Sequence, residues 1–205
     1  MKKLTFLMLM ISACMMLSAL GGNIFAGVGM SSITGDETDD YSSKISWSVG
    51  ASLDLPMGDN LIIEPGVRFF SGGATSESSE SYSGYNFKYE ATLTLNYLDI
   101  FAKAKYKIGA IQPYIGLGLP ILMSADSELK VSTPFGSESE SYDEKDSFAS
   151  VNFNLMLGVE YILMDKFTVG VEYSRTLNNI IDDKDLDFSQ NLNNIMLNVG
   201  YKFDF

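Results

Sequence analysis

The feature that most constrains the fold is the order of long and short gaps between strand-like segments. In these segments apolar and polar residues alternate with the period of two that a β-strand has. The gaps run long, short, long, short, long, short, long, and the long ones are acidic. The segments cover 22–33, 43–55, 60–71, 86–108, 112–125, 148–163, 166–178 and a last strand that includes 194–205. This order predicts eight antiparallel strands, with tight turns at one end and long loops at the other.

A soluble sandwich has no reason to sort its connections by length, whereas a transmembrane β-barrel does. Such barrels have an even number of strands, short periplasmic turns and long extracellular loops, and about ten tilted residues cross the apolar band. Beyond the first twenty residues no apolar run reaches the length of about 20 that a membrane helix needs. The predicted fold class is all-β, an eight-stranded antiparallel up-and-down transmembrane β-barrel in a bacterial outer membrane. The rival fold is a secreted soluble barrel or lipocalin, which would turn its apolar face inward.

The amino terminus, MKKLTFLMLMISACMMLSALGG, is typical of a signal peptide. We predict a signal peptide over 1–21 and a barrel domain over 22–205, with cleavage after Ala19 or Gly21 and Ala26 as a further possibility. Ile11 to Cys14 also resembles a lipobox, which would make Cys14 a lipidated first residue. Cleavage after any of the other sites leaves a mature chain without cysteine, and therefore without disulfides.

The last strand indicates which face of the wall is apolar. In NIMLNVGYKFDF, residues 194–205, every odd position is apolar or aromatic. In a membrane barrel this face meets lipid, and aromatic rings settle at the two interfaces. The predicted periplasmic girdle comprises Tyr106, Tyr161, Phe167, Tyr201, Phe203 and Phe205. The predicted outer girdle comprises Phe69, Tyr89, Phe148 and Tyr173.

The middle of the chain carries a more specific pattern. NYLDIFAKAKYKIGAIQPYIGLGLPI, residues 96–121, resembles a segment of small outer-membrane barrels of the PorT-like family, with Phe101 where that family would have proline. The mature chain as a whole resembles OmpA/OmpX-type small barrels. The resemblance implies that Tyr201, Phe203 and Phe205 form a carboxy-terminal signal for the barrel-assembly machinery.

The polar face of the strands predicts a lumen charge network. Its members are Glu64, Arg68, Lys103, Lys105, Glu160, Glu172 and Lys202, with Glu90 on the same face. Unpaired buried charges are costly, so we expect Glu64 to approach Lys103 or Lys105, and Glu160 or Glu172 to approach Lys202. Because apolar residues change phase within 93–108, we also expect a β-bulge near 98–100. These charges predict a closed, polar-filled lumen; the alternative is a polar pathway.

The charge and the residue types limit the function. The net charge of −12 argues against nucleic-acid binding. With no histidine, Ser-His and Cys-His catalysis are impossible. A carboxylate pair could still do acid/base work, but no spacing picks one out, so we predict no enzyme. The sequence gives no reason to name a cofactor. The acidic loops 36–40, 76–81, 137–146 and 182–187 lack the spacing of a calcium loop, and we predict no metal site.

The predicted function is a structural or surface-interaction role. Its partners would be outer-membrane lipid, the assembly machinery and an extracellular ligand held by the acidic loops. The alternative is a passive porin or channel, for small polar solutes or for small hydrophobic molecules.

Overall fold

The computed structural model describes residues 21–82, 85–133, 136–182 and 189–204. The strands are β1 (Gly21–Gly35), β2 (Tyr41–Met57), β3 (Leu61–Tyr82), β4 (Tyr85–Tyr106), β5 (Ile111–Thr133), β6 (Gly136–Asp143), β7 (Asn154–Leu163), β8 (Phe167–Thr176) and β9 (Gln190–Asp204). One short 3₁₀ helix, η1 (Lys145–Ser147), precedes β7. No helix within the described ranges is long and apolar enough to cross a membrane.

Eight of the nine strands close into a barrel, because β4 pairs with β5 and β1 pairs with β9. All neighbours are antiparallel, and β6 pairs with β5 outside the ring. The eight-stranded antiparallel up-and-down barrel predicted from the sequence is confirmed. The predicted signal peptide lies outside the described residues, apart from Gly21, which opens β1.

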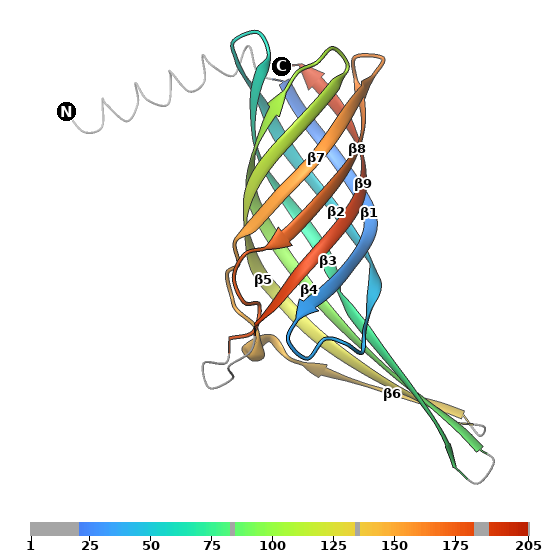
Figure 1. The fold of residues 1–205 in the computed structure, drawn as a ribbon. Helices are drawn as coiled ribbons and strands as arrows, with labels where there is room; N and C mark the ends of the chain where they lie inside the picture. Colours follow the sequence, from blue (N-terminus) through green and yellow to red (C-terminus); the bar gives the residue numbers. More distant parts are fainter. Residues whose placement is uncertain (1–20, 83–84, 134–135, 183–188, 205) are drawn as a thin grey trace.

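The connections divide the barrel into two different ends (Figure 1). Both ends of the described chain and the turns β2–β3, β4–β5 and β7–β8 lie at one end, which we call the turn end. Met164 and Asp165 form the β7–β8 turn with positive φ angles of 51° and 62°, the backbone that a tight hairpin turn needs to follow the strand twist. The long connections lie at the opposite end, which we call the loop end.

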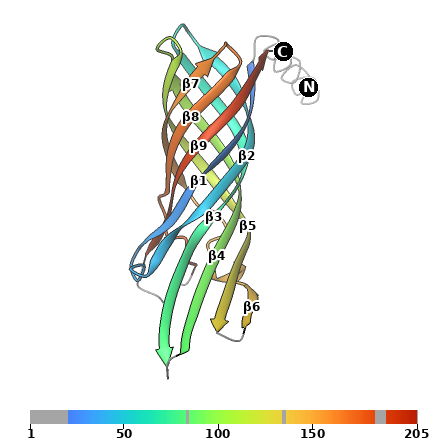
Figure 2. The same cartoon turned by 90° about the vertical axis from the view of Figure 1, so that its right-hand side faces the viewer.

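The two Ser/Glu tracts are strands, so the prediction that 76–81 and 137–146 are loops is wrong for most of their length. β3 and β4 stay in register out to Tyr82↔Tyr85, and β5 pairs with β6 over Asp126–Thr133. Together 74–82, 85–95, 124–133 and β6 form the projecting sheet, which extends beyond the loop end of the barrel (Figure 2). Glutamate is a poor strand former. The tracts pair because β3, β4 and β5 continue beyond the barrel wall in register with one another.

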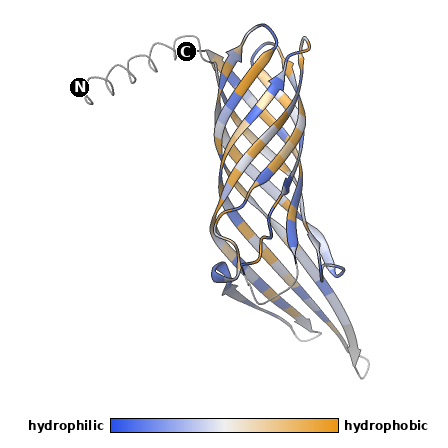
Figure 3. Ribbon diagram, turned by 60° about the vertical axis from the view of Figure 1, so that its left-hand side comes forward, coloured by the Kyte–Doolittle hydropathy of each residue, from blue (hydrophilic) through white to orange (hydrophobic). Residues whose placement is uncertain are grey.

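The outer wall is apolar, and its hydrophobic residues are concentrated on the barrel rather than on the projecting sheet (Figure 3). On β9 the odd face points outward, with Ile195 60% exposed and Val199 54% exposed. The even face of β9 lines the interior, where Met196 is 1% exposed. The apolar face is therefore turned away from the barrel axis.

The interior has two different halves. Nearer the turn end it is charged, and nearer the loop end it holds an apolar cluster that we call the loop-end cluster. Its members are Ile33, Phe70, Ala74, Leu95, Tyr97, Leu122, Ala125, Phe148, Ile180, Leu192 and Met196. The prediction of a lumen filled by polar groups is therefore wrong for the loop-end half.

The phase change in β4 arises from this cluster and not from a bulge at 98–100. β4 keeps one register with β3 from Tyr85 to Tyr106, so Leu95, Tyr97 and Asp99 all point inward. The irregularity lies on β5, where Asn96 pairs with Ser124 and Tyr97 with Leu122, leaving Met123 as the extra residue.

Candidate functional site

The central part of the lumen contains four buried charged side chains, which we call the central ion-pair cluster. The Arg68 guanidinium lies 2.9 Å from Asp99 through Nε and contacts Glu172 through Nη1. Lys103 Nζ lies 2.8 Å from the other Glu172 oxygen, to which the Tyr114 hydroxyl also donates at 2.9 Å. Glu172 is 0% exposed, so its charge depends on these three donors. The strands β3, β4, β5 and β8 are tied together across the barrel.

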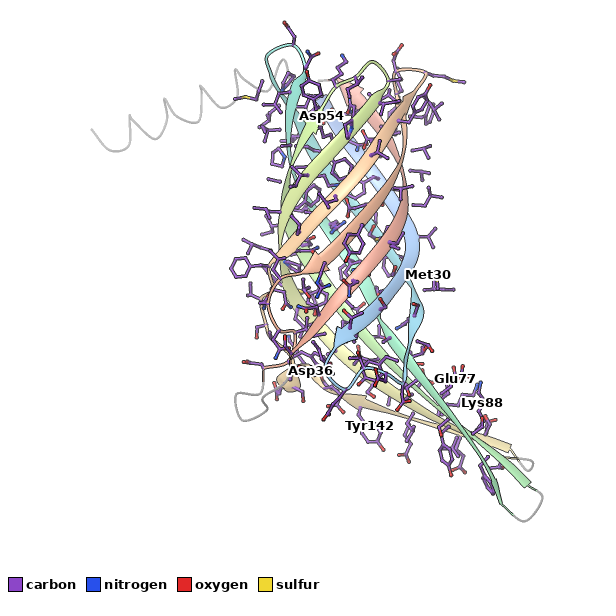
Figure 4. The ribbon with its side chains drawn as sticks, viewed as in Figure 1. Met30, Asp36, Asp54, Glu77, Lys88 and Tyr142 are labelled. Atoms are coloured by element: carbon purple, nitrogen blue, oxygen red, sulfur yellow. The ribbon has the colours of Figure 1, made fainter. Side chains whose placement is uncertain are left out.

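A second group, the turn-end ion-pair cluster, lies between the central ion-pair cluster and the turn end. Lys105 contacts Glu64 and lies 3.1 Å from Glu160. Lys202 lies 2.7 Å from Asp54 and 3.9 Å from Glu160. A polar pocket of about 360 Å³ opens beside Asp54 and Lys202, and Asp54 is labelled near the turn end in Figure 4. The mouth of the lumen is thus bridged by opposite charges.

The structure brings all seven residues of the sequence-predicted network into the lumen. Glu64 contacts Lys105, Glu160 approaches Lys202, and Lys103 binds Glu172 rather than Glu64. Glu90, which was assigned to the same face, instead lies on the projecting sheet and 3.5 Å from Lys88.

Two lumen carboxylates, Asp54 and Asp99, were not predicted from the sequence. Asp54 continues the polar face of Ser48 and Ser52, and this alternation was visible in the sequence. Asp99 was missed because the expected bulge at 98–100 would have changed its facing, whereas unbroken alternation along β4 places it beside Arg68.

The loop-end cluster closes the lumen between these charges and the loop end. Phe148 and Ile180 come from connections between strands and are 7% and 0% exposed. Ala149 N donates to Ile180 O at 2.8 Å, which joins the two connections to each other. Both are joined to the wall, since Leu122 N donates to Ser150 O and Ile180 N donates to Gln190 O, each at 2.9 Å. The prediction that Phe148 belongs to the outer girdle is wrong, because its ring fills the barrel interior.

The projecting sheet has two unlike faces. Side chains alternate along strands, and the register places Tyr89 opposite Val131, Ala91 opposite Leu129 and Ser127 opposite Tyr142. This apolar face continues the inner side of the wall from Leu95. Tyr89, Leu129 and Tyr142 are 36%, 38% and 49% exposed. At its base lies a pocket of about 260 Å³, lined by Tyr41, Ala74, Ser76, Ala91, Leu93, Ser127, Glu144, Ser147 and Phe148.

The opposite face of the projecting sheet is polar. Lys88 lies 3.0 Å from Glu77 and 3.5 Å from Glu90, and Glu77 and Lys88 are neighbours in Figure 4. The hydrogen bond to Glu77 raises the pKa of Lys88 above its ordinary value. Tyr142, on the apolar face, donates to Glu140, which raises the pKa of Tyr142.

Most of the predicted girdle residues lie on the outer wall. The prediction that Tyr89 belongs to the outer girdle is wrong, because it lies on the apolar face of the projecting sheet. Tyr106, Tyr161, Phe167 and Tyr201 are near the turn end and are 38–52% exposed, and the Phe167 and Tyr201 rings are 5.5 Å apart. Phe203 is half-buried, with Gly22 against its ring. Tyr173 lies toward the loop end and donates to Asn193 at 2.9 Å. Phe205 lies outside the described residues.

No group of three or more carboxylate, histidine or cysteine side chains in the described part of the chain is arranged to hold a metal ion. The acidic segment 182–187 lies outside the described residues, apart from Asp182, so nothing follows for most of it.

Comparison with protein families decides what kind of barrel this is. The model of the outer membrane protein beta-barrel domain matches residues 4–203. The chain belongs to this family. It is therefore a protein of the bacterial outer membrane, with the turn end at the periplasmic side and the loop end at the cell surface. Comparison with curated proteins gives no match.

The fold is also similar to solved small barrels. Ail, the attachment invasion locus protein of Yersinia pestis, solved with a heparin analogue, is 17% identical over 90% of this chain and 99% of its own, with a TM-score of 0.48. Neisserial surface protein A is 11% identical over 89% and 97%, with a TM-score of 0.49. The outer membrane protease OmpT of Escherichia coli is 10% identical over 92% and 97%, with a TM-score of 0.39.

Proposed function

We propose that the protein is a closed outer-membrane barrel that presents the projecting sheet as an interaction surface outside the cell. The observation that carries this proposal is the unpartnered apolar face of that sheet, with Tyr89, Leu129 and Tyr142 exposed beyond the membrane. Exposed apolar surface of this kind, rimmed by polar residues, marks interaction sites. The role is binding rather than catalysis.

The interior supports a closed barrel. Ion pairs cross the lumen in two clusters, and the loop-end cluster lies between them and the cell surface. An eight-stranded barrel is only wide enough for its side chains. A passive channel would need Phe148 and Ile180 to leave the lumen, together with the strand connections that carry them.

Acidic side chains define the chemistry of the proposed partner. Glu138 and Glu140 of β6 share the apolar face with Leu129 and Val131, and Glu144 lies at its base. A partner with apolar side chains flanked by basic ones would fit both features. For assembly, we propose that Tyr201, Phe203 and Phe205 are read by the barrel-assembly machinery.

The test is a cell-binding assay. Cells that carry the protein in their outer membrane are added to a panel of immobilised extracellular proteins and glycans, and the bound cells are measured. The variant Tyr89→Ser/Leu129→Ser removes the apolar face, and Glu90→Ser/Lys130→Ser is the matched control on the opposite face. We expect the first variant to lose binding about tenfold, since buried aromatic anchors dominate interfaces, and the control to retain it. Equal binding by both variants would refute the role of this face, and discrete conductance of the wild-type protein in a planar bilayer would refute the closed lumen.

A further inference from the structure

The outer wall carries an apolar groove beside the junction of β5 and β7. The β5–β7 ladder ends at Gly118↔Asn154, and pairing of the same two segments resumes where Asn152 N donates to Pro120 O at 2.8 Å. The groove lies over this interruption and has a volume of about 640 Å³. Its walls include Leu117, Phe153 and Leu177, which are 62%, 57% and 57% exposed. Because this wall faces membrane lipid, the groove is continuous with the protein–lipid interface.

A cation lies beside the groove on the same outer face. Leu117 pairs with Leu155, and Leu155 pairs with Arg175. Neighbouring strands are about 4.8 Å apart, so the Arg175 backbone is about 10 Å from Leu117. Leu177 follows Arg175 by two residues, and Tyr173 of the outer girdle precedes it by two. The charge is therefore at the extracellular edge of the apolar band.

The Arg175 side chain is held in place without its charge being neutralised. Its Nη2 donates to Asn191 Oδ1 at 3.1 Å, and the Asn191 amide donates to the carbonyls of Thr176 and Asn178, each at 3.1 Å. Among the residues that the structure describes, no carboxylate forms an ion pair with Arg175. A guanidinium has five N–H donors in a planar fork that matches phosphate oxygens.

We propose that this part of the wall binds an anionic lipid of the outer leaflet, with a phosphate on Arg175 and an acyl chain in the groove. The phosphate and the acyl chain of one lipid would span the distance between the two features. The acidic projecting sheet lies outside the apolar band and does not offer this combination. The lipid site does not depend on the proposed surface interaction, because Leu117, Arg175 and Leu177 all lie outside the projecting sheet.

The test uses displacement of a quenching lipid. Trp47 is the single tryptophan and lies on the outer face of β2, three strands from β8 in the ring. In the Trp47→Phe/Leu177→Trp protein, a bilayer of brominated phosphatidylcholine quenches the fluorescence at position 177. Unbrominated lipid A, which carries phosphates and acyl chains, is then added in increasing fractions.

We expect lipid A to relieve quenching about fivefold more effectively at position 177 than at Trp47 of the otherwise unchanged protein, as one cation near an anionic lipid supplies. Arg175→Gln should abolish the difference, whereas Lys166→Gln, the same charge change in the periplasmic turn, should not. Equal relief at both tryptophans, or a preference that survives Arg175→Gln, would overturn the lipid site. Neither result would bear on binding by the projecting sheet.

Discussion

Replacing Glu172 by glutamine tests whether the central ion-pair cluster stabilises the barrel. Glutamine keeps the shape of the side chain but removes the charge shared by Arg68 and Lys103. Arg68 would keep Asp99 at 2.9 Å, while Lys103 would lose its ion pair and keep the contact with the Tyr114 ring, 4.6 Å from its Nζ. Breaking a buried pair by removing one partner costs about 3–5 kcal/mol, and we expect the free energy of unfolding to fall by that amount.

The assay is reversible urea unfolding of the refolded protein in lipid vesicles, followed by Trp47 fluorescence. Glu77→Gln is the matched control, because Glu77 pairs with Lys88 at 3.0 Å and both side chains are about half exposed. Exposed pairs contribute about 0–1 kcal/mol, so the same chemical change should cost several-fold less there.

A double variant tests whether the cost of Glu172→Gln arises at Lys103. If the cost of Glu172→Gln comes from leaving Lys103 unpaired, Lys103→Met should cost less in the Glu172→Gln background than in the wild-type protein. A loss below about 1 kcal/mol for Glu172→Gln, or strict additivity of the two changes, would contradict an ion-paired lumen.

Two further substitutions test the lumen closure and the lipid-facing wall. Phe148→Ala should lower the free energy of unfolding by about 3–5 kcal/mol because it empties part of the loop-end cluster, whereas Phe153→Ala, at a ring 57% exposed on the outer wall, should cost clearly less in the same urea titration. Val171→Lys places a charge in the middle of the outer wall of β8 and should cost about 2–4 kcal/mol in lipid vesicles. A neutral effect there would argue against lipid contact at this strand.

Strand order and facing could be predicted from sequence because they depend on local alternation. Each of Ile195, Leu197 and Val199 takes the outer face simply by its odd position. The sorting of long and short gaps then sets which end carries the turns. The sequence also indicated which charges enter the lumen, because side chains that alternate with the lipid-facing residues of a strand point into the barrel.

The partners of those charges could not be predicted in the same way. Lys103 binds Glu172 of β8 rather than Glu64 of the adjacent β3, because closure of the ring brings β8 across the lumen from β4. The inward position of Tyr97 also could not be predicted from the sequence. An apolar side chain in a membrane barrel can be accommodated either by the lipid or by an apolar cluster in the interior.

By itself, then, the sequence determined the strand count of the wall, the outward apolar face and the location in the outer membrane, since these follow from the period of the residues and the lengths of the gaps. Only the tertiary structure decided that the lumen is apolar toward the cell surface, that the Ser/Glu tracts pair into a sheet, and that Arg175 lies beside an open groove. Those features depend on contacts between strands far apart in the chain, and the register that creates them is set by closure of the barrel.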